Sequence, residues 1–402
     1  MIPQSIMSLK ELRALILHKN QIRGSLFQLG LTSLTKLRFL VLSNNFLSSS
    51  IPKEICSLKR LVSLNLSSNQ LGGHIPSEIG FLSKLIRLDL SNNNIIGRLD
   101  SLFMTNKPGK YNNKSSLSNL KVLALSSNQL TGPIPHELGD LVSLEYLNLS
   151  QNSLVDSIPT KIINLKELKS LDLSDNNLSG HIPEQIGNLV RLRSLKLNSN
   201  QLSGHIPNNL GNLAKLCFLY LQSNKLSWHI PQELGSLLNL KDLQLYDNKL
   251  IGSIPNSLGN LPRLSTLSVW RNQLSGCISQ ELGNLVNLEN LYLSENMLTG
   301  SIPNSLGNLT KLTALHIRSN QLSGSIPKEI SSLMNLNILH IDQNNLSGEL
   351  PLGLCAGGQL QNFTAQDNNL VGPLPTSLLN CKTLVRVRLE RNQLEGDISE
   401  LG

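Results

Sequence analysis

Side chains that suit ligand binding recur at regular intervals in the second half of this 402-residue chain. They are Tyr220, Gln222, Tyr246, Asp247, Trp270, Arg271, Tyr292, Glu295, His316, Arg318, His340 and Asp342. Tyr, Trp and Arg are the residue types that most often anchor interfaces. The set favours an extended peptide bound over an aromatic floor with charged flanks. The structural alternative is that aromatic residues simply suit strands.

A second candidate site is the pair Arg386 and Arg388, which lie two residues apart in the stretch LVRVRL. In a strand this spacing places both guanidinium groups on one face. Two parallel guanidinium groups suit a carboxylate. Glu390 and Arg391 stand beside the pair and could instead form surface ion pairs with it. Both interpretations stay open at this point.

His316 and His340 are 24 residues apart, the interval that also separates Tyr246 from Trp270. A constant interval predicts one column of side chains on neighbouring strands. The plain expectation is two solvated histidines. The alternative is that both protonate in mild acid and attract an acidic ligand.

The sequence gives little indication of catalysis, of cofactor or metal binding, or of nucleic-acid or membrane binding. The chain has no nucleophile elbow, phosphate-binding loop, dinucleotide fingerprint, zinc-protease motif or kinase signature, so we expect no enzyme, cofactor or metal site. The net charge of +8 is mild and no basic block occurs, so we expect no nucleic-acid partner. No apolar run is long enough to cross a bilayer, so a membrane would be reached only through segments outside this chain.

The five cysteines are too few and too scattered to be a disulfide framework. They are Cys56, Cys217, Cys277, Cys355 and Cys381. The plain expectation is buried free thiols. The pair most worth testing for a disulfide is Cys355 with Cys381.

A repeat must position all of these residues, because the chain is 3% aromatic and leucine dominates its hydrophobic content. The unit L-x-x-L-x-L-x-x-N-x-L-x-G-x-I-P-x-x-L-G-x-L occurs in 16 copies between Asn20 and Asn392, and the step is 24 residues from Asn128 onward. The two leucines of L-x-L should point inward from a short strand, and the x residues outward. The Asn should satisfy backbone groups of neighbouring turns. The Gly marks a position that disfavours a Cβ, and the Pro predicts an extended, non-helical convex segment.

Stacked coils of this kind predict a single solenoid over residues 1–402 with a concave parallel sheet. A loop insertion is expected around residues 100–116, where the step lengthens to 35 residues. Terminal caps are not visible, so we expect a piece of a longer protein. Trp228 stands where other copies have Gly, and it is either a surface patch for a partner or a local distortion.

The 24-residue repeat with G-x-I-P resembles the plant-specific class of leucine-rich repeats and is similar to ectodomains of plant receptor-like kinases. The stretch Leu354–Asn392 resembles peptide-sensing members in particular. The resemblance implies an α/β-type solenoid, a right-handed leucine-rich repeat superhelix with a concave parallel sheet. In similar peptide receptors an R-x-R pair in this register grips the free C-terminal carboxylate of the peptide, and Arg386 and Arg388 match it.

The resemblance also implies perception of a peptide or protein ligand at the extracellular side of the plasma membrane, after secretion through the ER, with recruitment of a co-receptor kinase ectodomain. The chain departs from the family in lacking an N-terminal Cys-bearing cap, a C-terminal Cys pair, a membrane helix and a kinase domain, so it cannot signal alone. The alternatives are a soluble interaction or inhibitor protein in defence and a purely structural scaffold.

Secretion would make seven sequons candidate glycosylation sites, although Asn-Leu-Ser and Asn-Leu-Thr arise easily from this repeat. They are Asn65, Asn113, Asn148, Asn177, Asn308, Asn345 and Asn362. Glycans on Asn65 and Asn148 would stand on the early concave face and push ligand binding toward later coils. A glycan on Asn362 would crowd the region before Arg386.

Overall fold

The computed structural model describes residue 6 and the ranges 8–27, 30, 33–103 and 117–396, in two compact units, Met1–Leu202 (unit 1) and Ser203–Gly402 (unit 2). Each unit repeats the same coil: a short strand, an Asn turn, a second short strand in most coils, and a helical turn. Most leucines and isoleucines of the described coils are buried between these elements.

The first sheet in each unit is parallel and follows chain order, as predicted. In unit 1 its strands are β1 (Ala14–Ile16), β3 (Phe39–Val41), β5 (Ser63–Asn65), β7 (Arg87–Asp89), β9 (Val122–Ala124), β11 (Tyr146–Asn148), β13 (Ser170–Asp172) and β14 (Ser194–Lys196). In unit 2 they are β16 (Phe218–Tyr220), β18 (Asp242–Gln244), β20 (Thr266–Ser268), β22 (Asn290–Tyr292), β24 (Ala314–His316), β26 (Ile338–His340), β28 (Asn362–Thr364) and β30 (Arg386–Arg388). Leu291 pairs in register with Leu267 and Leu315, so equivalent residues of successive coils stand side by side.

A second row of parallel strands, which the repeat pattern did not predict, follows the Asn turns. In unit 1 it comprises β2 (Arg23–Ser25), β4 (Phe46–Ser50), β6 (Gln70–His74), β8 (Asn94–Arg98), β10 (Gln129–Pro133) and β12 (Ser153–Val155). In unit 2 it comprises β15 (Ser203–Gly204), β17 (Lys225–Trp228), β19 (Lys249–Gly252), β21 (Gln273–Cys277), β23 (Met297–Gly300), β25 (Gln321–Ser325), β27 (Asn345–Glu349), β29 (Asn369–Gly372) and β31 (Gln393–Leu394).

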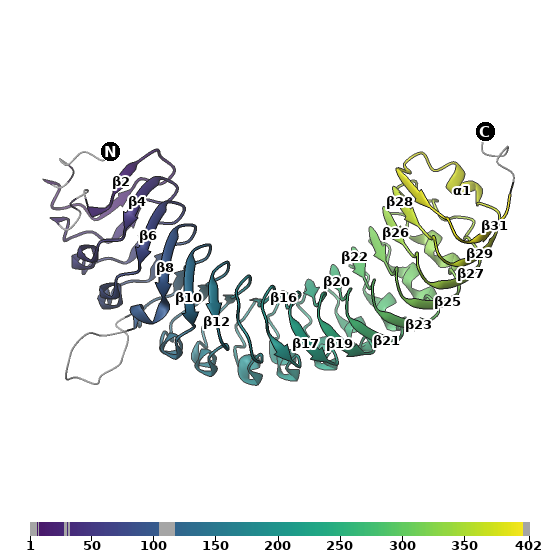
Figure 1. Cartoon of the computed structure of the whole chain (residues 1–402), viewed down its shortest axis with the longest axis horizontal. Coiled ribbons are helices and arrows are strands. Elements are labelled where there is room, and N and C mark those ends of the chain that lie inside the picture. Colours follow the sequence, from purple (N-terminus) through teal and green to yellow (C-terminus); the bar gives the residue numbers. More distant parts are fainter. Residues whose placement is uncertain (1–5, 7, 28–29, 31–32, 104–116, 397–402) are drawn as a thin grey trace. The chain divides into compact units, whose positions relative to one another are not determined.

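Helical turns complete the coils, and within unit 2 they lie on the outer side, opposite the first sheet (Figure 1). The 3-10 helices are η4 (Lys53–Ser57), η5 (Ser77–Phe81), η6 (Leu99–Leu102), η7 (His136–Asp140), η8 (Thr160–Asn164), η9 (Glu184–Asn188), η10 (Asn208–Asn212), η11 (Gln232–Ser236), η12 (Asn256–Asn260), η13 (Gln280–Asn284), η14 (Asn304–Asn308) and η15 (Lys328–Ser332). One α-helix, α1 (Thr376–Leu379), also occurs in the described ranges, where no helix is long and apolar enough to cross a membrane.

The prediction of a non-helical convex segment was therefore wrong. Pro255 itself is extended, with φ −63° and ψ 131°, but it sits directly before η12 and the chain turns after it. Proline suits this place because its φ is fixed and its missing N–H is not needed at a helix start. The repeated Pro thus fixes where each helical turn begins.

The asparagine ladder is confirmed. The Asn344 Nδ2 donates to the carbonyls of Ile317, Ile341 and Asp342 at 3.1–3.2 Å. Its Oδ1 accepts from the Leu322 N–H at 3.0 Å. Each such amide ties its own turn to the preceding coil and satisfies backbone groups that burial would otherwise leave unpaired.

The glycine four residues after the Asn is also confirmed as a position that disfavours a Cβ. Gly252 has a φ of 76°, and a Cβ there would lie 2.3 Å from the His229 ring. Trp228 occupies the equivalent place with a φ of 70°, close to the glycine value. The coil is therefore not distorted at Trp228; the tryptophan adopts the left-handed conformation that glycine tolerates best.

The insertion leaves the register of the first sheet intact. β7 pairs directly with β9, with Leu88 opposite Leu123. The Asn128 Oδ1 still accepts from the Ile95 N–H at 3.0 Å. Residues 100–102 of the expected loop belong to η6, while 104–116, with the sequon Asn113, lie outside the described residues.

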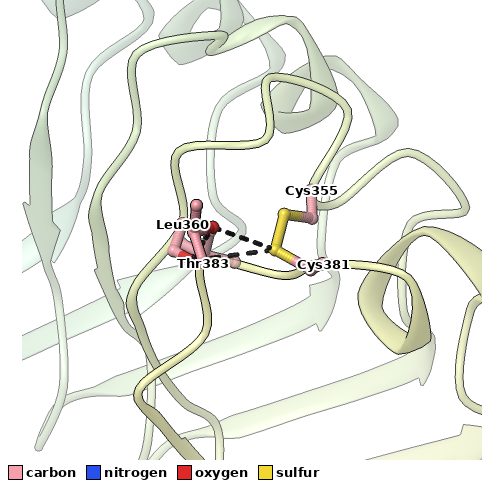
Figure 2. The surroundings of a disulfide bond; sticks show 4 residues. All are labelled: Cys355, Leu360, Cys381 and Thr383. Carbon is pink, nitrogen blue, oxygen red and sulfur yellow. Dashed lines mark hydrogen bonds between the residues drawn. A yellow bond between two sulfur atoms is a disulfide. The ribbon is translucent and has the colours of Figure 1, made fainter.

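Cys355 and Cys381 form a disulfide, with their Cα atoms 5.9 Å apart (Figure 2). Beside it, the Thr383 hydroxyl donates to the Leu360 carbonyl at 2.7 Å. The expectation of buried free thiols holds for Cys56 alone, because Cys277 is exposed and Cys217 is partly exposed. The sequence could not show that the two cysteines meet, because one lies in an irregular loop between β27 and β28.

Asn368→Ala should lower the free energy of unfolding by about 3 kcal/mol, because three carbonyls and the Leu346 N–H would lose their partner. Urea unfolding and amide exchange at Leu346 measure the effect. The matched control is Asn369→Ala at the exposed neighbouring position, with an expected change within about 0.5 kcal/mol. Equal loss in both variants would contradict the role of the buried amide.

Reduction of the disulfide should lower the free energy of unfolding of unit 2 by up to about 3.5 kcal/mol. The bond joins residues 26 positions apart, and without it the unfolded chain gains conformational entropy. Thermal unfolding with and without a thiol reductant measures this. The double variant Cys355→Ser, Cys381→Ser should no longer respond to reductant, and exposed Cys277→Ser should respond as the parent does. A parent protein insensitive to reductant would refute the stabilising role.

Candidate functional site

A hollow of about 460 Å³ lies on the exposed face of the first sheet in unit 2. Its lining, called the aromatic hollow below, consists of Gln244, Tyr246, Ser268, Trp270, Tyr292, Ser294, Glu295, His316, Arg318 and His340. Seven of these residues were predicted from their columns. Gln244, Ser268 and Ser294 were missed, because small or amide side chains give no signal of their own in the repeat.

The register of β22, β24 and β26 builds one wall of the aromatic hollow. Tyr292 pairs opposite His316, which in turn pairs opposite His340. Parallel neighbours are about 4.8 Å apart, and the rings follow that spacing. The Tyr292 and His316 centroids are 4.8 Å apart and nearly perpendicular, and those of His316 and His340 are 4.4 Å apart.

Two further rings form another wall just beyond β18 and β20. Tyr246 and Trp270 stack with their centroids 4.8 Å apart and an interplanar angle of 14°. The Arg271 guanidinium lies 5.7 Å from the Trp270 ring centroid. The four ring positions from Tyr246 to His316 therefore lie on consecutive coils and point to one surface, as the sequence predicted.

The charged flanks pair with one another. Arg271 lies 3.8 Å from Asp247 and 3.5 Å from Glu295, and Arg318 lies 3.1 Å from Glu295. Exposed pairs of this kind add little stability. They do leave the rim of the aromatic hollow without an uncompensated charge.

The floor carries buried polar atoms without partners in the described structure. Ser294 is only 5% exposed, and its hydroxyl has no hydrogen-bond partner among the described residues. The His316 Nε2 is also buried and unpartnered. Such groups are uncommon in folded proteins, and they mark this floor as a place where a polar contact is missing.

Burial favours the neutral form of both histidines. It lowers the pKa of His316 to about 4, with smaller contributions from His340 and Arg318. Burial likewise lowers the pKa of His340, opposed by Asp342 and aided by Arg318 and Arg386. The expectation of a solvated side chain was wrong for His316, whose Nε2 is buried, while His340 is half-buried. Partial removal from water opposes joint protonation in mild acid.

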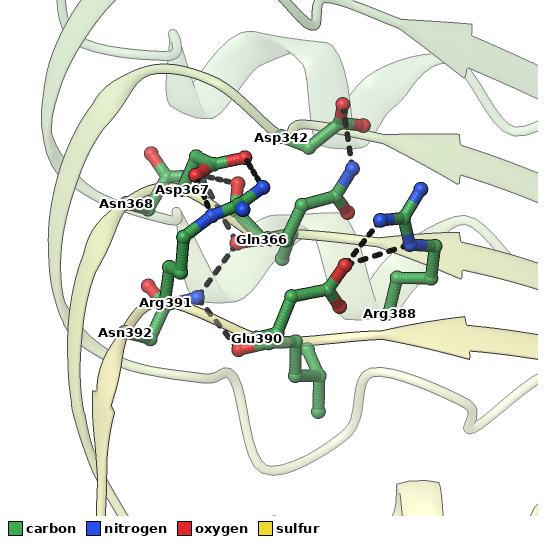
Figure 3. A network of polar contacts seen from close by, with 10 residues as sticks. Asp342, Gln366, Asp367, Asn368, Arg388, Glu390, Arg391 and Asn392 are labelled. Carbon is green, nitrogen blue, oxygen red and sulfur yellow. Dashed lines mark hydrogen bonds and ion pairs between the residues drawn. The ribbon is translucent and has the colours of Figure 1, made fainter.

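Five of the twelve residues predicted from their columns do not line the aromatic hollow: Tyr220, Gln222, Asp247, Arg271 and Asp342. Asp247 and Arg271 belong to the ion pairs at its rim. The Tyr220 hydroxyl donates to Asp242 at 2.8 Å, and burial raises the pKa of Tyr220. Gln222 is half-buried near it. Asp342 is 3% exposed and accepts hydrogen bonds from Thr364 and, at 3.1 Å, from Gln366 (Figure 3). Its carboxylate is thus directed at the next coil rather than at a ligand.

The arginine pair on β30 is split. Arg388 donates to Glu390 at 2.8 Å and holds the pKa of that carboxyl below its ordinary value (Figure 3). Arg391 binds Asp367, at 2.7 Å for one of the two bonds. Arg386 is exposed, and the described residues place no carboxylate within ion-pair distance of it. The ion-pair interpretation therefore holds for Arg388, while Arg386 stays a candidate for a carboxylate.

The six sequons within the described residues fall outside the aromatic hollow. Asn177, Asn308 and Asn345 are exposed. Asn65, Asn148 and Asn362 are half-buried on strands of the first sheet. The Asn65 and Asn148 amide oxygens accept from the backbone of the serine two residues later at 3.0 Å. Glycosylation at these sites stays a prediction.

A family profile described as "Leucine-rich repeat region" matches residues 98–276 and 219–393, and one described as "Leucine Rich Repeat" matches 36–58, 60–82 and 84–106. No curated protein sequence matches the chain significantly.

Solved structures are similar over nearly the whole chain. The plant peptide hormone receptor RGFR1, solved in complex with RGF2, is 35% identical over 99% of this chain and 62% of its own, with a TM-score of 0.92. The Arabidopsis receptor kinase HAESA, in complex with the peptide hormone IDA and the co-receptor SERK1, is 31% identical over 98% of this chain and 72% of its own, with a TM-score of 0.81. A leucine-rich repeat protein of Leptospira interrogans is 31% identical over 98% of this chain and 94% of its own, with a TM-score of 0.74. The chain spans less than two thirds of the RGFR1 chain.

The buried His316 should make stability depend on pH. Its pKa of about 4 lies below the ordinary 6.5, so the unfolded chain binds more protons between these values. The free energy of unfolding is therefore highest above about pH 6.5 and decreases as the pH falls toward 4, because protonation of His316 favours the unfolded chain. His316→Gln should flatten the plot of unfolding free energy against pH in this window, as measured by urea unfolding. Exposed His181→Gln is the control, and an unchanged slope for His316→Gln would contradict the burial argument.

Proposed function

This chain belongs to the leucine-rich repeat family, with the repeats that plant receptor-kinase ectodomains carry, and we propose that it is part of the ligand-binding ectodomain of a plant cell-surface receptor-like kinase. Its ligand in this proposal is an extended peptide on the concave face of unit 2. The observation that carries the proposal is the aromatic hollow, in which rings from consecutive coils gather over a floor with an unpartnered serine hydroxyl.

The dimensions suit a short extended segment. The hollow reaches from the coil of β18 to that of β26, which is four strand spacings or about 19 Å. An extended peptide rises about 3.3 Å per residue, so about six residues span it. Gln244, half-buried on the floor, offers its carboxamide oxygen to such a backbone, while its Nε2 already donates to Asp242 at 2.6 Å.

The hollow favours an uncharged, flat side chain of the peptide. Tyr246, Trp270 and Tyr292 supply ring surface, and His316 is neutral at physiological pH. The rim charges are already paired, so a charged side chain placed here would lose water without gaining a partner. The free guanidinium of Arg386, two strands beyond β26, would take the terminal carboxylate.

The same proposal places the chain outside the cell, after secretion through the ER. HAESA was solved with a peptide hormone and with the co-receptor SERK1, and we propose a co-receptor kinase ectodomain as a partner of this chain also. The disulfide suits an oxidising compartment. The chain acts here by binding, and catalysis would belong to a kinase domain beyond it.

Peptides selected from a random library with free C-termini on the immobilised chain provide the probe. Tyr246→Ala and Trp270→Ala should each weaken binding about 30-fold or more, because buried aromatic anchors carry most interface energy. The matched control is Tyr146→Ala, an exposed tyrosine on β11 of unit 1, which should leave affinity unchanged. Unaltered affinity in both ring variants would remove the aromatic hollow as the binding site.

Arg386 is tested separately with the same peptides carrying a free or an amidated C-terminus. Arg386→Ala should reduce the affinity of the free peptide to that of the amidated one. Arg388→Ala should have a smaller effect, because Glu390 already engages that side chain. Equal binding of both peptide forms would exclude a carboxylate contact while leaving the aromatic hollow standing.

A further inference from the structure

A second hollow of about 830 Å³ lies in unit 2 between the end of β17 and the turns η10, η11 and η12. Its lining, called the Trp228 hollow below, includes His205, Asn208, Trp228, His229, Gln232 and Asn256. It shares no residue with the aromatic hollow. Its volume falls within the range of about 300–1,000 Å³ that small-ligand sites occupy.

The presence of a tryptophan at position 228 is not explained by the requirements of the fold. The residue is 62% exposed, and the described structure gives its indole no stacking partner. Its φ of 70° is one that glycine adopts without strain and a bulky residue does not. The equivalent residues of the coils on either side are Gly204 and Gly252, with φ of 77° and 76°. A glycine at 228 would relieve this backbone strain, and most of the tryptophan surface contacts nothing in the described fold.

The chemistry around the indole is polar and nearly uncharged. Asn208, Gln232 and Asn256 are exposed and bring carboxamides, each of which both donates and accepts. The Ser257 hydroxyl donates to the Gln232 carbonyl at 2.6 Å and ties η11 to η12. Of the described residues that line the hollow, none is Lys or Arg, and Glu233 is the sole carboxylate. An anionic ligand would therefore meet no permanent positive charge.

We propose that the Trp228 hollow binds a neutral sugar ring of an oligosaccharide. The apolar C–H face of a pyranose would lie on the open indole, and its hydroxyls would bond to the carboxamides and imidazoles. The sugar comes either from a free polysaccharide or from the glycan of a neighbouring glycoprotein. The site is independent of the peptide site and does not rest on it.

Calorimetric titration of the whole chain with named saccharides tests this. The probes are cellohexaose and mannohexaose as neutral chains, a released high-mannose glycan, and hexagalacturonate as the anionic comparison. We expect millimolar or tighter binding of at least one neutral probe and weaker binding of hexagalacturonate. Preference for the free chains or for the high-mannose glycan identifies the source. Absence of all neutral binding, or equal binding of hexagalacturonate, would overturn the proposal.

Two substitutions at one position make the test specific. Trp228→Gly should weaken saccharide binding at least about tenfold, and Trp228→Phe should retain most of it. Trp270→Ala, in the aromatic hollow, should leave it unchanged. Trp228→Gly should also unfold at the same or a higher temperature than the parent. A lower unfolding temperature would assign Trp228 a packing role, and Trp228-dependent binding of a basic peptide in place of sugars would assign the hollow to a protein partner.

Discussion

The asparagine amide that closes each coil, fully or partly buried from Asn45 to Asn392, is the interaction on which the rest of the structure depends. Asn344 binds carbonyls of its own turn and of the preceding coil, and its oxygen takes the N–H of Leu322. These groups lie where water cannot reach, so the geometry of one turn dictates that of the next. The constant pitch, and with it every column of side chains, follows from this amide together with the leucines stacked beneath it.

Fixed columns explain why a binding surface can form without a dedicated loop or cleft. Tyr292, His316 and His340 come from three coils, yet their rings touch because parallel strands repeat at a spacing close to ring contact. The contact has an electrostatic consequence, because each ring shields its neighbour from water. The histidines therefore act as neutral aromatic groups, and the paired rim charges leave a surface that favours shape and polarity over charge.

The sequence predicted the features that follow from the 24-residue period. It did not predict contacts that depend on how far individual side chains extend toward the next coil. The strand register, the asparagine ladder and the meeting of Tyr246 with Trp270 all follow from equal spacing. The burial of Asp342 does not, because it arises from Thr364 and Gln366 one coil later. The disulfide stayed open for a similar reason: a separation of 26 residues places Cys355 and Cys381 on adjacent coils, but the period does not fix whether their side chains meet.

Trp228 shows how such a solenoid can carry unrelated sites. In a repeat structure each coil contacts only its neighbours, so a strained or exposed residue affects stability locally. The backbone at Trp228 keeps the left-handed conformation of Gly204 and Gly252, so the coil accepts the substitution without altering the first sheet on its other side. The residues of the glycine column, which lie in the second row of strands, can thus be substituted independently of the ring columns on the first sheet. A single unit can thereby present two surfaces of different chemistry.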